Sequence, residues 1–159
     1  MKKLSVVIPA YNEEKRIAET LKNLDGYLEK QNYEYEIVVV VNNTKDRTYE
    51  IVQELEKTTV QNAKAMNLKE GGKGNAVKRG ILESASGDII MFMDADNATP
   101  ISEIEKFLPF FDQGYDVVIG SRYTNPDLVK VKQPFYRILL SRLSNMLIQV
   151  MAVPGIKDT

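Results

Sequence analysis

The sequence predicts an α/β fold in which helices cover both faces of an open, mostly parallel sheet. Short apolar runs rich in Val and Ile alternate with segments whose apolar residues recur at helical spacing, and the loops between them are short. The run Glu36–Val41 is β-branched after its first residue, which is typical of a strand buried on both faces of a parallel sheet. Polar clusters follow the predicted strands, at the edge where such sheets bind ligands.

The elements follow one another from the N-terminus in strand–helix order. A first apolar strand is closed by Pro9, and the helix that follows has Asn12 as its N-cap. A later helix begins at Pro100, because proline favours the first helical turn. We therefore expect strands at Leu4–Ile8, Glu36–Val41, Val60–Leu68, Asp88–Met93 and Asp116–Gly120. We expect helices at Glu13–Lys30, Asp46–Lys57, from the glycines at 71–74 to Ser86, Pro100–Asp112 and Pro134–Val153.

Length and composition exclude several classes of protein. The chain has 159 residues, of which 43% are hydrophobic and 27% charged, as in ordinary soluble globular proteins. Its net charge of −1 argues against a protein that coats nucleic acid, because such proteins carry a large basic excess. No apolar run approaches the ~20 residues that a membrane-spanning helix needs, and we expect no signal peptide in the N-terminal segment, because its apolar run is short and contains Ser5 and Pro9.

The chain contains neither histidine nor cysteine, and this restricts its chemistry. A Ser-His-Asp triad, a cysteine nucleophile, a thiolate metal site and a disulfide are all excluded. Any metal must be held by oxygen ligands, which points to Mg²⁺ or Mn²⁺. Any general base must be Asp, Glu, Lys or Tyr. The lack of cysteine fits a cytoplasmic protein.

Asp94 and Asp96 are the candidates for a metal site. They stand two residues apart at a strand end, so their side chains share one face if the strand conformation persists. A hard cation held by one or two carboxylates and by substrate phosphates is the usual arrangement in enzymes that use nucleotides. The alternative is a solvated acidic loop that caps the next helix. The apolar run Ile89–Met93, which delivers the pair to the ligand edge, favours the metal.

A glycine-rich loop, Gly71–Gly74, precedes a predicted helix. Its amides and the helix N-terminus are suited to an anion, with Lys73 as a point charge. The spacing matches neither a P-loop nor a dinucleotide fingerprint. A simple turn and helix cap is the alternative.

Further candidates are arginines and one aromatic residue near strand ends. Arg122 and Arg137 are candidates for phosphate contacts, because a guanidinium can donate two parallel hydrogen bonds to phosphate oxygens. Arg142 fits a surface position. Tyr11 and Glu13 are placed to flank a base or a ribose, although packing is the alternative for the tyrosine.

Together these segments resemble proteins of glycosyltransferase family 2, which have the Rossmann-like GT-A fold. The resemblance covers Leu4 to Thr159, essentially the whole chain. Within the family, the later segments are similar to dolichyl- or polyprenyl-phosphate sugar transferases. The segments that carry the resemblance are Ser5–Glu13, Glu36–Thr48, Gly72–Gly74, Gly87–Asp96, Val117–Arg122, Arg137 with Ser141, and Gly155–Thr159.

The resemblance implies roles for individual residues. It implies that Asp94 and Asp96 hold Mg²⁺ or Mn²⁺. It implies a catalytic set near the phosphates, formed by Arg122, Arg137 and Ser141. The residues implied around the nucleotide are Pro9, Ala10, Tyr11, Glu13, Val41, Asn43, Lys73 and Ala95.

The chain departs from the family pattern in its acidic loop. That loop usually reads Asp-Asp-Gly-Ser-X-Asp, and here the segment from Asn42 to Asp46 keeps only the last Asp. An amide offers a base both a donor and an acceptor, so the preferred base is left open. The polar metal partner that some relatives have two residues past the pair is replaced by Ala98.

The resemblance implies a metal-dependent, inverting hexosyltransferase that uses a UDP- or GDP-linked sugar. We expect the acceptor to be a polyprenyl or dolichyl phosphate, because a phosphate is already ionised near pH 7 and needs no general base. The alternatives are a nucleotide-binding fragment without transferase activity and a family member that acts on a polysaccharide or another hydroxyl acceptor. A sugar-nucleotide-forming nucleotidyltransferase is a further alternative, but its glycine-rich signature belongs after the first strand.

Organisation and location follow as expectations. We expect residues 1–159 to form one domain, incomplete at its C-terminal, acceptor-binding end, and located in the cytoplasm or at the cytoplasmic face of a membrane. The predicted helix Pro134–Val153 carries an apolar stripe, which fits core packing, a surface on a membrane or on further sequence, and a dimer interface. The oligomeric state is left open, and no nucleic-acid partner is expected.

Overall fold

A computed structural model describes residues 3–120 of the chain. Contacts divide the chain into two compact units, Met1–Lys106 and Phe107–Thr159, and each is described by itself. The expectation of one domain over 159 residues stays a prediction. The predicted helix Pro134–Val153 lies outside the described residues.

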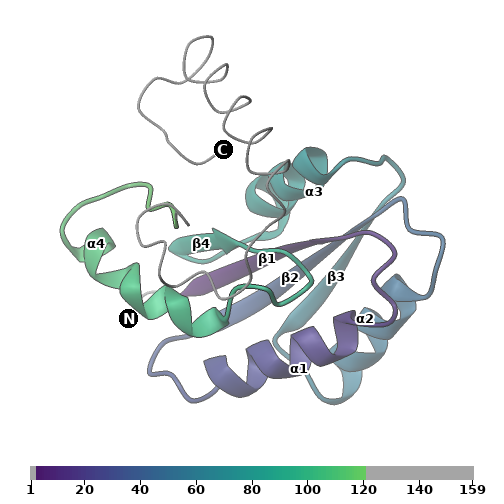
Figure 1. The fold of residues 1–159 in the computed structure, drawn as a ribbon, viewed down its shortest axis with the longest axis horizontal. Coiled ribbons are helices and arrows are strands. Elements are labelled where there is room, and N and C mark those ends of the chain that lie inside the picture. The colour runs from purple at the N-terminus through teal and green to yellow at the C-terminus, as the bar shows by residue number, and fades with distance from the viewer. Residues whose placement is uncertain (1–2, 121–159) are drawn as a thin grey trace, which may run out of the picture. The chain divides into compact units, whose positions relative to one another are not determined.

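The first unit contains a four-stranded parallel sheet with the strand order β3-β2-β1-β4 (Figure 1). The central strand β1 pairs with β2 from Leu4 opposite Tyr35 to Ala10 opposite Val41. The predicted open parallel sheet is therefore confirmed. The strands are β1 (Leu4–Ala10), β2 (Tyr35–Asn42), β3 (Ala63–Leu68) and β4 (Ile89–Phe92).

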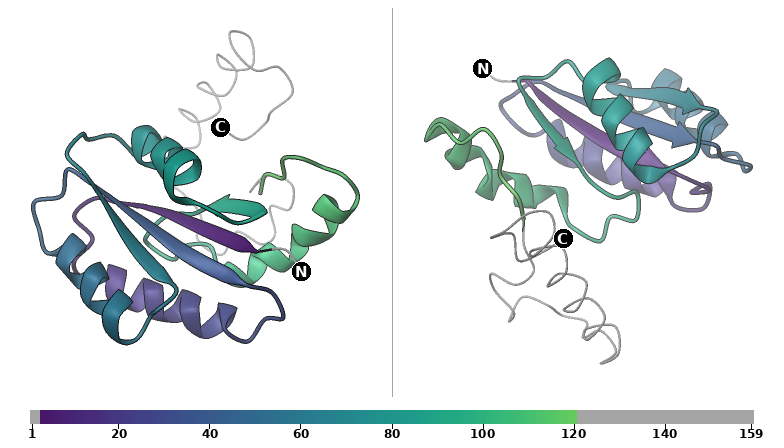
Figure 2. Two further views of the ribbon diagram at one scale, coloured as in Figure 1. Left: turned by 180° about the vertical axis from the view of Figure 1, so that it is seen from behind. Right: turned by 90° about the horizontal axis from the view of Figure 1, so that it is seen from above.

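Helices cover both faces of this sheet, as the alternating pattern predicts (Figures 1 and 2). The helices α1 (Ile17–Leu28) and α2 (Thr48–Thr58) lie on one face. The helix α3 (Lys73–Arg79) lies on the other and continues into a π-helical turn, Gly80–Ser84.

The core lies between the sheet and these helices. All seven residues of β1 are buried, and the valines at 38–41 of β2 have an exposed fraction of 0%. On the other face, Gly80 lets the helical segment approach the sheet. An added Cβ there would lie 2.5 Å from Val7 Cγ1 and 2.8 Å from Val40 Cγ2. This close approach explains why the position needs glycine.

A buried carboxylate joins the segments at the N-terminal ends of the strands. Glu36 is 8% exposed and accepts hydrogen bonds from Ser5 Oγ at 2.5 Å, from the Ser86 amide at 2.6 Å and from Lys64 Nζ at 2.9 Å. Burial by itself would raise the pKa of Glu36. The hydrogen bonds from Ser5, Lys64 and Ser86 outweigh burial and lower that pKa from 4.5 to about 2. The ionised carboxylate is therefore part of the folded structure.

The predicted start of the first helix is wrong. The helix α1 begins at Ile17, and Asn12 is not its N-cap, since Arg16 precedes the helix without a side-chain cap. Asn12 has a φ of 54° and its Oδ1 accepts a hydrogen bond from the Lys45 amide at 3.0 Å. The amide side chain therefore binds the loop after β2 instead of capping the helix.

The segment Pro100–Asp112 forms no single helix. In the first unit, Ile101–Lys106 is a 3₁₀-helix, and the described part of the second unit contains a short helix, α4 (Leu108–Asp112). Pro109 lies in the first turn of α4. Proline is tolerated there but disrupts a helix interior, which explains the interruption.

Strand predictions in the later part of the chain also need correction. Asp116–Gly120 forms no strand, and Val117 is 73% exposed, because no strand of the described part of the second unit pairs with it. The apolar run Ile89–Met93 suggests a buried strand, but β4 is only partly buried: Ile89 is 8% exposed, whereas Phe92 is 55% exposed.

Candidate functional site

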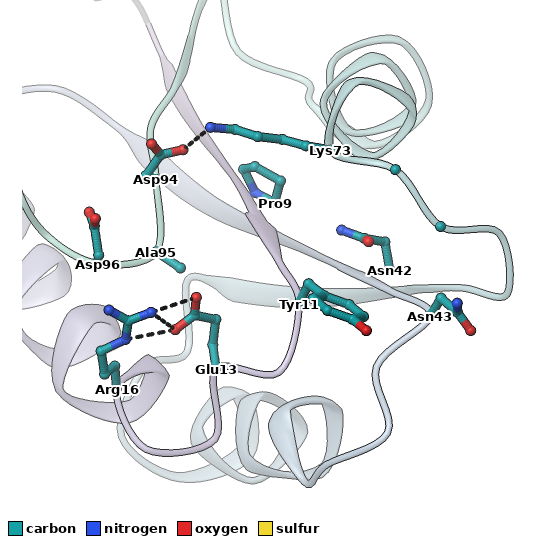
Figure 3. A pocket seen from close by; sticks show the side chains of 12 residues that line it. Pro9, Tyr11, Glu13, Arg16, Asn42, Asn43, Lys73, Asp94, Ala95 and Asp96 are labelled. Atoms are coloured by element: carbon teal, nitrogen blue, oxygen red, sulfur yellow. Dashed lines mark hydrogen bonds and ion pairs between the residues drawn. The ribbon is translucent and has the colours of Figure 1, made fainter. Parts of the chain in front are cut away.

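A pocket of about 640 Å³ opens at the carboxyl ends of the strands in the first unit (Figure 3). Its lining comes from β1 and the loop after it, from the end of β2, from the segment that leads into α3, and from the loop after β4. This is the edge at which parallel sheets bind ligands. The lining residues are Pro9, Tyr11, Glu13, Arg16, Asn42, Asn43, Gly71, Gly72, Lys73, Asp94, Ala95 and Asp96.

Most of the site residues predicted from the sequence that lie in the described part of the chain meet in this pocket. Ala10 and Val41 do not line it, because their side chains are buried in β1 and β2 with an exposed fraction of 0%. Arg122, Arg137 and Ser141 lie outside the described residues, and their roles stay predictions. The predicted residues that line the pocket are Pro9, Tyr11, Glu13, Asn43, Lys73, Asp94, Ala95 and Asp96.

The sequence-based assignment missed Arg16, which lines the pocket as part of an ion pair. Arg16 Nε donates to Glu13 Oε2 at 2.8 Å, and Arg16 Nη2 donates to Glu13 Oε1 at 2.9 Å. These two hydrogen bonds restrain both side chains, and the guanidinium compensates the negative charge of the Glu13 carboxylate. Opposite charges three residues apart in a helical turn were the available signal. Asn42, Gly71 and Gly72 were part of the motifs but had not been assigned as individual site residues.

Hydrogen bonds join the loop after β1 to the loop after β2. Thr48 Oγ1 accepts from the Glu13 amide at 2.8 Å, and Asp46 Oδ2 accepts from the Glu14 amide at 3.0 Å. Burial would raise the pKa of Asp46, but hydrogen bonds from Thr48 and from backbone amides, including that of Glu14, outweigh it and lower the pKa. The ionised Asp46 carboxylate therefore stabilises the loop that carries Tyr11 and Glu13 by accepting hydrogen bonds from its backbone and from Thr48.

The loop after β4 is held so that its two carboxylates face the pocket. The buried Thr20 Oγ1 donates to the Ala95 carbonyl at 2.8 Å. Asp96 Oδ1 accepts a hydrogen bond from the Ala98 amide at 3.0 Å. Figure 3 shows the side chains of Asp94 and Asp96 pointing the same way from this loop and Ala95 pointing away from them. The strand β4 ends at Phe92, however, and Ala95 and Asp96 form a turn, so the two carboxylates reach the pocket from a turn and not from a continued strand, as the sequence had suggested.

The donor set of this loop fits one kind of metal site. Among residues 3–120, no group of three or more acidic, histidine or cysteine side chains gathers closely enough to hold a metal ion. Asp94 and Asp96 supply oxygen ligands only, which suit Mg²⁺ or Mn²⁺. Two carboxylates fit an ion that also takes oxygens from a bound phosphate, and they do not fit a cage made by the protein alone.

The asparagines at the end of β2 form the opposite part of the pocket. Asn42 is 5% exposed and its Nδ2 donates to the Ala10 carbonyl at 3.4 Å. Asn43 has a φ of 47°, a conformation that glycine and asparagine adopt most readily. Counted back from Asp46, the pattern Asp-Asp-Gly-Ser-X-Asp places its glycine at Asn43 and its second aspartate at Asn42. The positive φ of Asn43 agrees with that register.

No helix in the described range 3–120 is both long enough and apolar enough to cross a membrane.

Comparison with known proteins identifies relatives of the whole chain. Residues 5–158 match the family described as Glycosyl transferase family 2. The chain is 41% identical over 157 residues to the dolichol-phosphate mannosyltransferase of Pyrococcus furiosus, covering 98% of this chain and 43% of that protein. It is 38% identical over 169 residues to a dolichyl-phosphate beta-glucosyltransferase of Trichomonas vaginalis, covering 98% of this chain and 50% of that protein. The chain thus spans about half the length of the curated relatives it matches.

Two solved structures share the fold. The crystal structure of S. aureus TarS 1–349 matches with a TM-score of 0.53 and 30% identity, over 70% of this chain and 32% of that one. The mannosyltransferase PcManGT from Pyrobaculum calidifontis, in complex with GDP-Man and Mn²⁺, matches with a TM-score of 0.54 and 29% identity. That match covers 64% of this chain and 30% of the other.

Proposed function

Because the chain belongs to glycosyltransferase family 2, we propose that its pocket binds a nucleoside-diphosphate sugar and that the protein transfers the sugar to an acceptor. The match to the family model confirms the family expected from the sequence, and the two solved structures confirm the expected GT-A fold. One observation carries the proposal. The carboxyl edge of the sheet brings a pair of carboxylates, Asp94 and Asp96, into the same pocket as the cationic side chains of Lys73 and Arg16.

The two ends of the pocket suit the two ends of such a donor. Figure 3 shows Tyr11, Asn42 and Asn43 toward one end and the two aspartates toward the other. Tyr11 is 52% exposed, so its ring offers a face to a base, and the Asn42 amide offers a donor and an acceptor. We place the base and ribose at this end and the diphosphate beside Lys73.

Asp94 and Asp96 are the residues that would hold Mg²⁺ or Mn²⁺. The ion would neutralise the diphosphate and stabilise the departing nucleoside diphosphate. The Mn²⁺ and GDP-Man in the complex of PcManGT support this assignment, since that protein shares the fold. The predicted phosphate contacts Arg122, Arg137 and Ser141 lie outside residues 3–120 and remain part of the proposal.

We assign a dolichyl or polyprenyl phosphate as the acceptor. The names of both relatives above contain this acceptor, and the chain has no histidine to deprotonate a hydroxyl group. An ionised phosphate oxygen forms the new bond to the anomeric carbon while the bond from that carbon to the diphosphate oxygen breaks. The electron pair leaves with the nucleoside diphosphate, and the configuration inverts. Such an acceptor places the reaction at a membrane surface, which we propose to be the cytoplasmic face.

The first test is calorimetric binding of UDP and GDP to the chain, with and without Mn²⁺. We expect one nucleotide to bind only with Mn²⁺ and that binding to be lost in Asp96→Ala. Asp88→Ala is the matched control, because Asp88 is exposed, precedes β4 and does not line the pocket. Nucleotide binding that does not depend on Mn²⁺, or that is retained in Asp96→Ala, would contradict the proposed site.

Transfer is measured next, with the matching labelled sugar nucleotide and a polyprenyl phosphate. Formation of a sugar-phosphate lipid supports the proposed reaction. Binding without transfer to this lipid or to water would favour the alternative of a nucleotide-binding chain without transferase activity. Release of pyrophosphate instead would favour a nucleotidyltransferase.

A further inference from the structure

One of the two candidate metal ligands already has a cationic partner from the protein itself. Lys73 Nζ lies 2.6 Å from Asp94 Oδ1, and the ion pair joins the first residue of α3 to the loop after β4 (Figure 3). The Lys73 side chain is 62% exposed and that of Asp94 is 55% exposed. An ammonium group therefore lies beside one of the two carboxylates that would hold the proposed metal ion.

We propose that Lys73 is an exchangeable counterion of the metal site, an inference that rests on the function proposed above. In the metal-free protein its ammonium group pairs with Asp94. When a metal ion and a nucleoside diphosphate bind, the ion takes over Asp94, and Lys73 turns to the diphosphate. An ammonium group and a divalent ion repel each other and compete for the same carboxylate, so each weakens the binding of the other to Asp94.

Lys73 is suited to this change of partner, whereas the other cation that lines the pocket is not. Arg16 is fixed by two hydrogen bonds to Glu13. Lys73 instead makes a single exposed ion pair through a flexible four-carbon stem. Its side chain is 62% exposed and its neighbours in the chain, Gly72 and Gly74, carry no side chains that could hinder it. The surroundings of Lys73 therefore leave room for its side chain to move.

The exchange couples metal binding to nucleotide binding. A metal ion alone must displace Lys73 from Asp94, so its affinity is reduced. A metal ion that arrives with a diphosphate supplies Lys73 with a new anionic partner, so the displaced ammonium group is not left unpaired. Removing the charge of Lys73 must therefore have opposite effects on the two affinities. A residue with a purely structural role would weaken both or neither.

The test compares Lys73→Met with the wild-type chain and with Lys78→Met. Lys78 is exposed on the same helix and lies outside the pocket, so its variant controls for the change in net charge. Mn²⁺ alone is titrated while free Mn²⁺ is followed by electron paramagnetic resonance. We expect Lys73→Met to bind Mn²⁺ about two- to fivefold more tightly, the range that the loss of an exposed ion pair allows. Lys78→Met should remain within the wild-type range.

The second titration measures UDP or GDP, whichever the wild-type chain binds, at saturating Mn²⁺. Here we expect Lys73→Met to bind about five- to tenfold more weakly, because a charge-assisted contact to the diphosphate is lost. Thermal unfolding of the variant checks that it is folded, and we expect it to match wild type because Lys73 is exposed.

The outcomes separate this inference from the proposed function. If the wild-type chain shows no Mn²⁺-dependent nucleotide binding, the proposed function fails and the inference fails with it. If wild type binds both, but Lys73→Met leaves the affinity for Mn²⁺ alone unchanged or lowers it, only the counterion role is overturned. An unchanged nucleotide affinity in Lys73→Met likewise overturns the exchange, because Lys73 would then make no contact with the diphosphate.

Discussion

The buried carboxylate of Glu36 makes the stability of this chain depend on pH in a way that can be measured. Glu36 has a pKa of about 2 in the folded chain and an ordinary value of 4.5. Because the folded-state value is depressed, its contribution to stability is fully present above the unfolded-state pKa. That contribution is lost as the pH falls from about 4.5 through about 2.

The size of the effect follows from the difference in pKa. A shift of about 2.5 units at about 1.4 kcal/mol per unit corresponds to about 3 kcal/mol of stability at pH 7 for Glu36. At pH 3, the unfolded chain has taken up its proton while the folded chain has not. The linkage relation then leaves only about 1 kcal/mol, so about 2 kcal/mol is lost between pH 7 and pH 3.

The assay is urea unfolding of wild type and Glu36→Gln at a series of pH values. Glutamine removes the charge and places its NH₂ group near donors from Lys64 and Ser86, so the variant should be at least about 3 kcal/mol less stable at pH 7. The difference in unfolding free energy between the two proteins should shrink by about 2 kcal/mol on going to pH 3. Glu54→Gln, at an exposed position of α2, is the matched control. A difference for Glu36→Gln that stays constant from pH 7 to pH 3 would refute the reasoning.

Two further predictions concern the packing of the sheet and the base-binding end of the pocket. Gly80→Ala should lower the unfolding free energy by about 1–3 kcal/mol, because its Cβ would overlap Val7 and Val40, whereas Gly74→Ala should raise it by up to about 1 kcal/mol. Urea unfolding measures both, and equal effects would contradict the packing argument. Tyr11→Ala should weaken binding of the preferred nucleoside diphosphate about tenfold through lost stacking, and Tyr11→Phe should preserve it. Calorimetry decides this, and similar losses in both variants would rule out stacking.

Local sequence patterns predicted the part of the structure that depends on local burial. The β-branched run in β2 predicted a strand buried on both faces of the sheet, because successive side chains point to opposite faces and all of them are apolar. The apolar run of β4 predicted that Asp94 and Asp96 follow a strand end at the ligand-binding edge, and both line the pocket there, although they stand in a turn beyond the strand. The family could also be identified, because the motifs at the strand ends stand in family order.

Local patterns failed where a side chain has a choice of distant partners. Asn12 has the chemistry of an N-cap, but the Lys45 amide lies within reach and Asn12 binds it instead. Asp116–Gly120 has the composition of a strand, but a strand forms only where a neighbour supplies hydrogen bonds. In both cases the deciding contact depends on residues elsewhere in the chain.

Local periodicity and the order of the motifs were enough to predict the parallel sheet, the family and several residues of the ligand-binding edge, because burial leaves a repeating pattern in the sequence. The pairing of side chains at that edge could be seen only in the folded chain. There, Lys73 pairs with Asp94 and Arg16 with Glu13. The physical reason is that such pairs are short-range contacts, and the strand order and the loop conformations that create them arise from packing across the whole sheet.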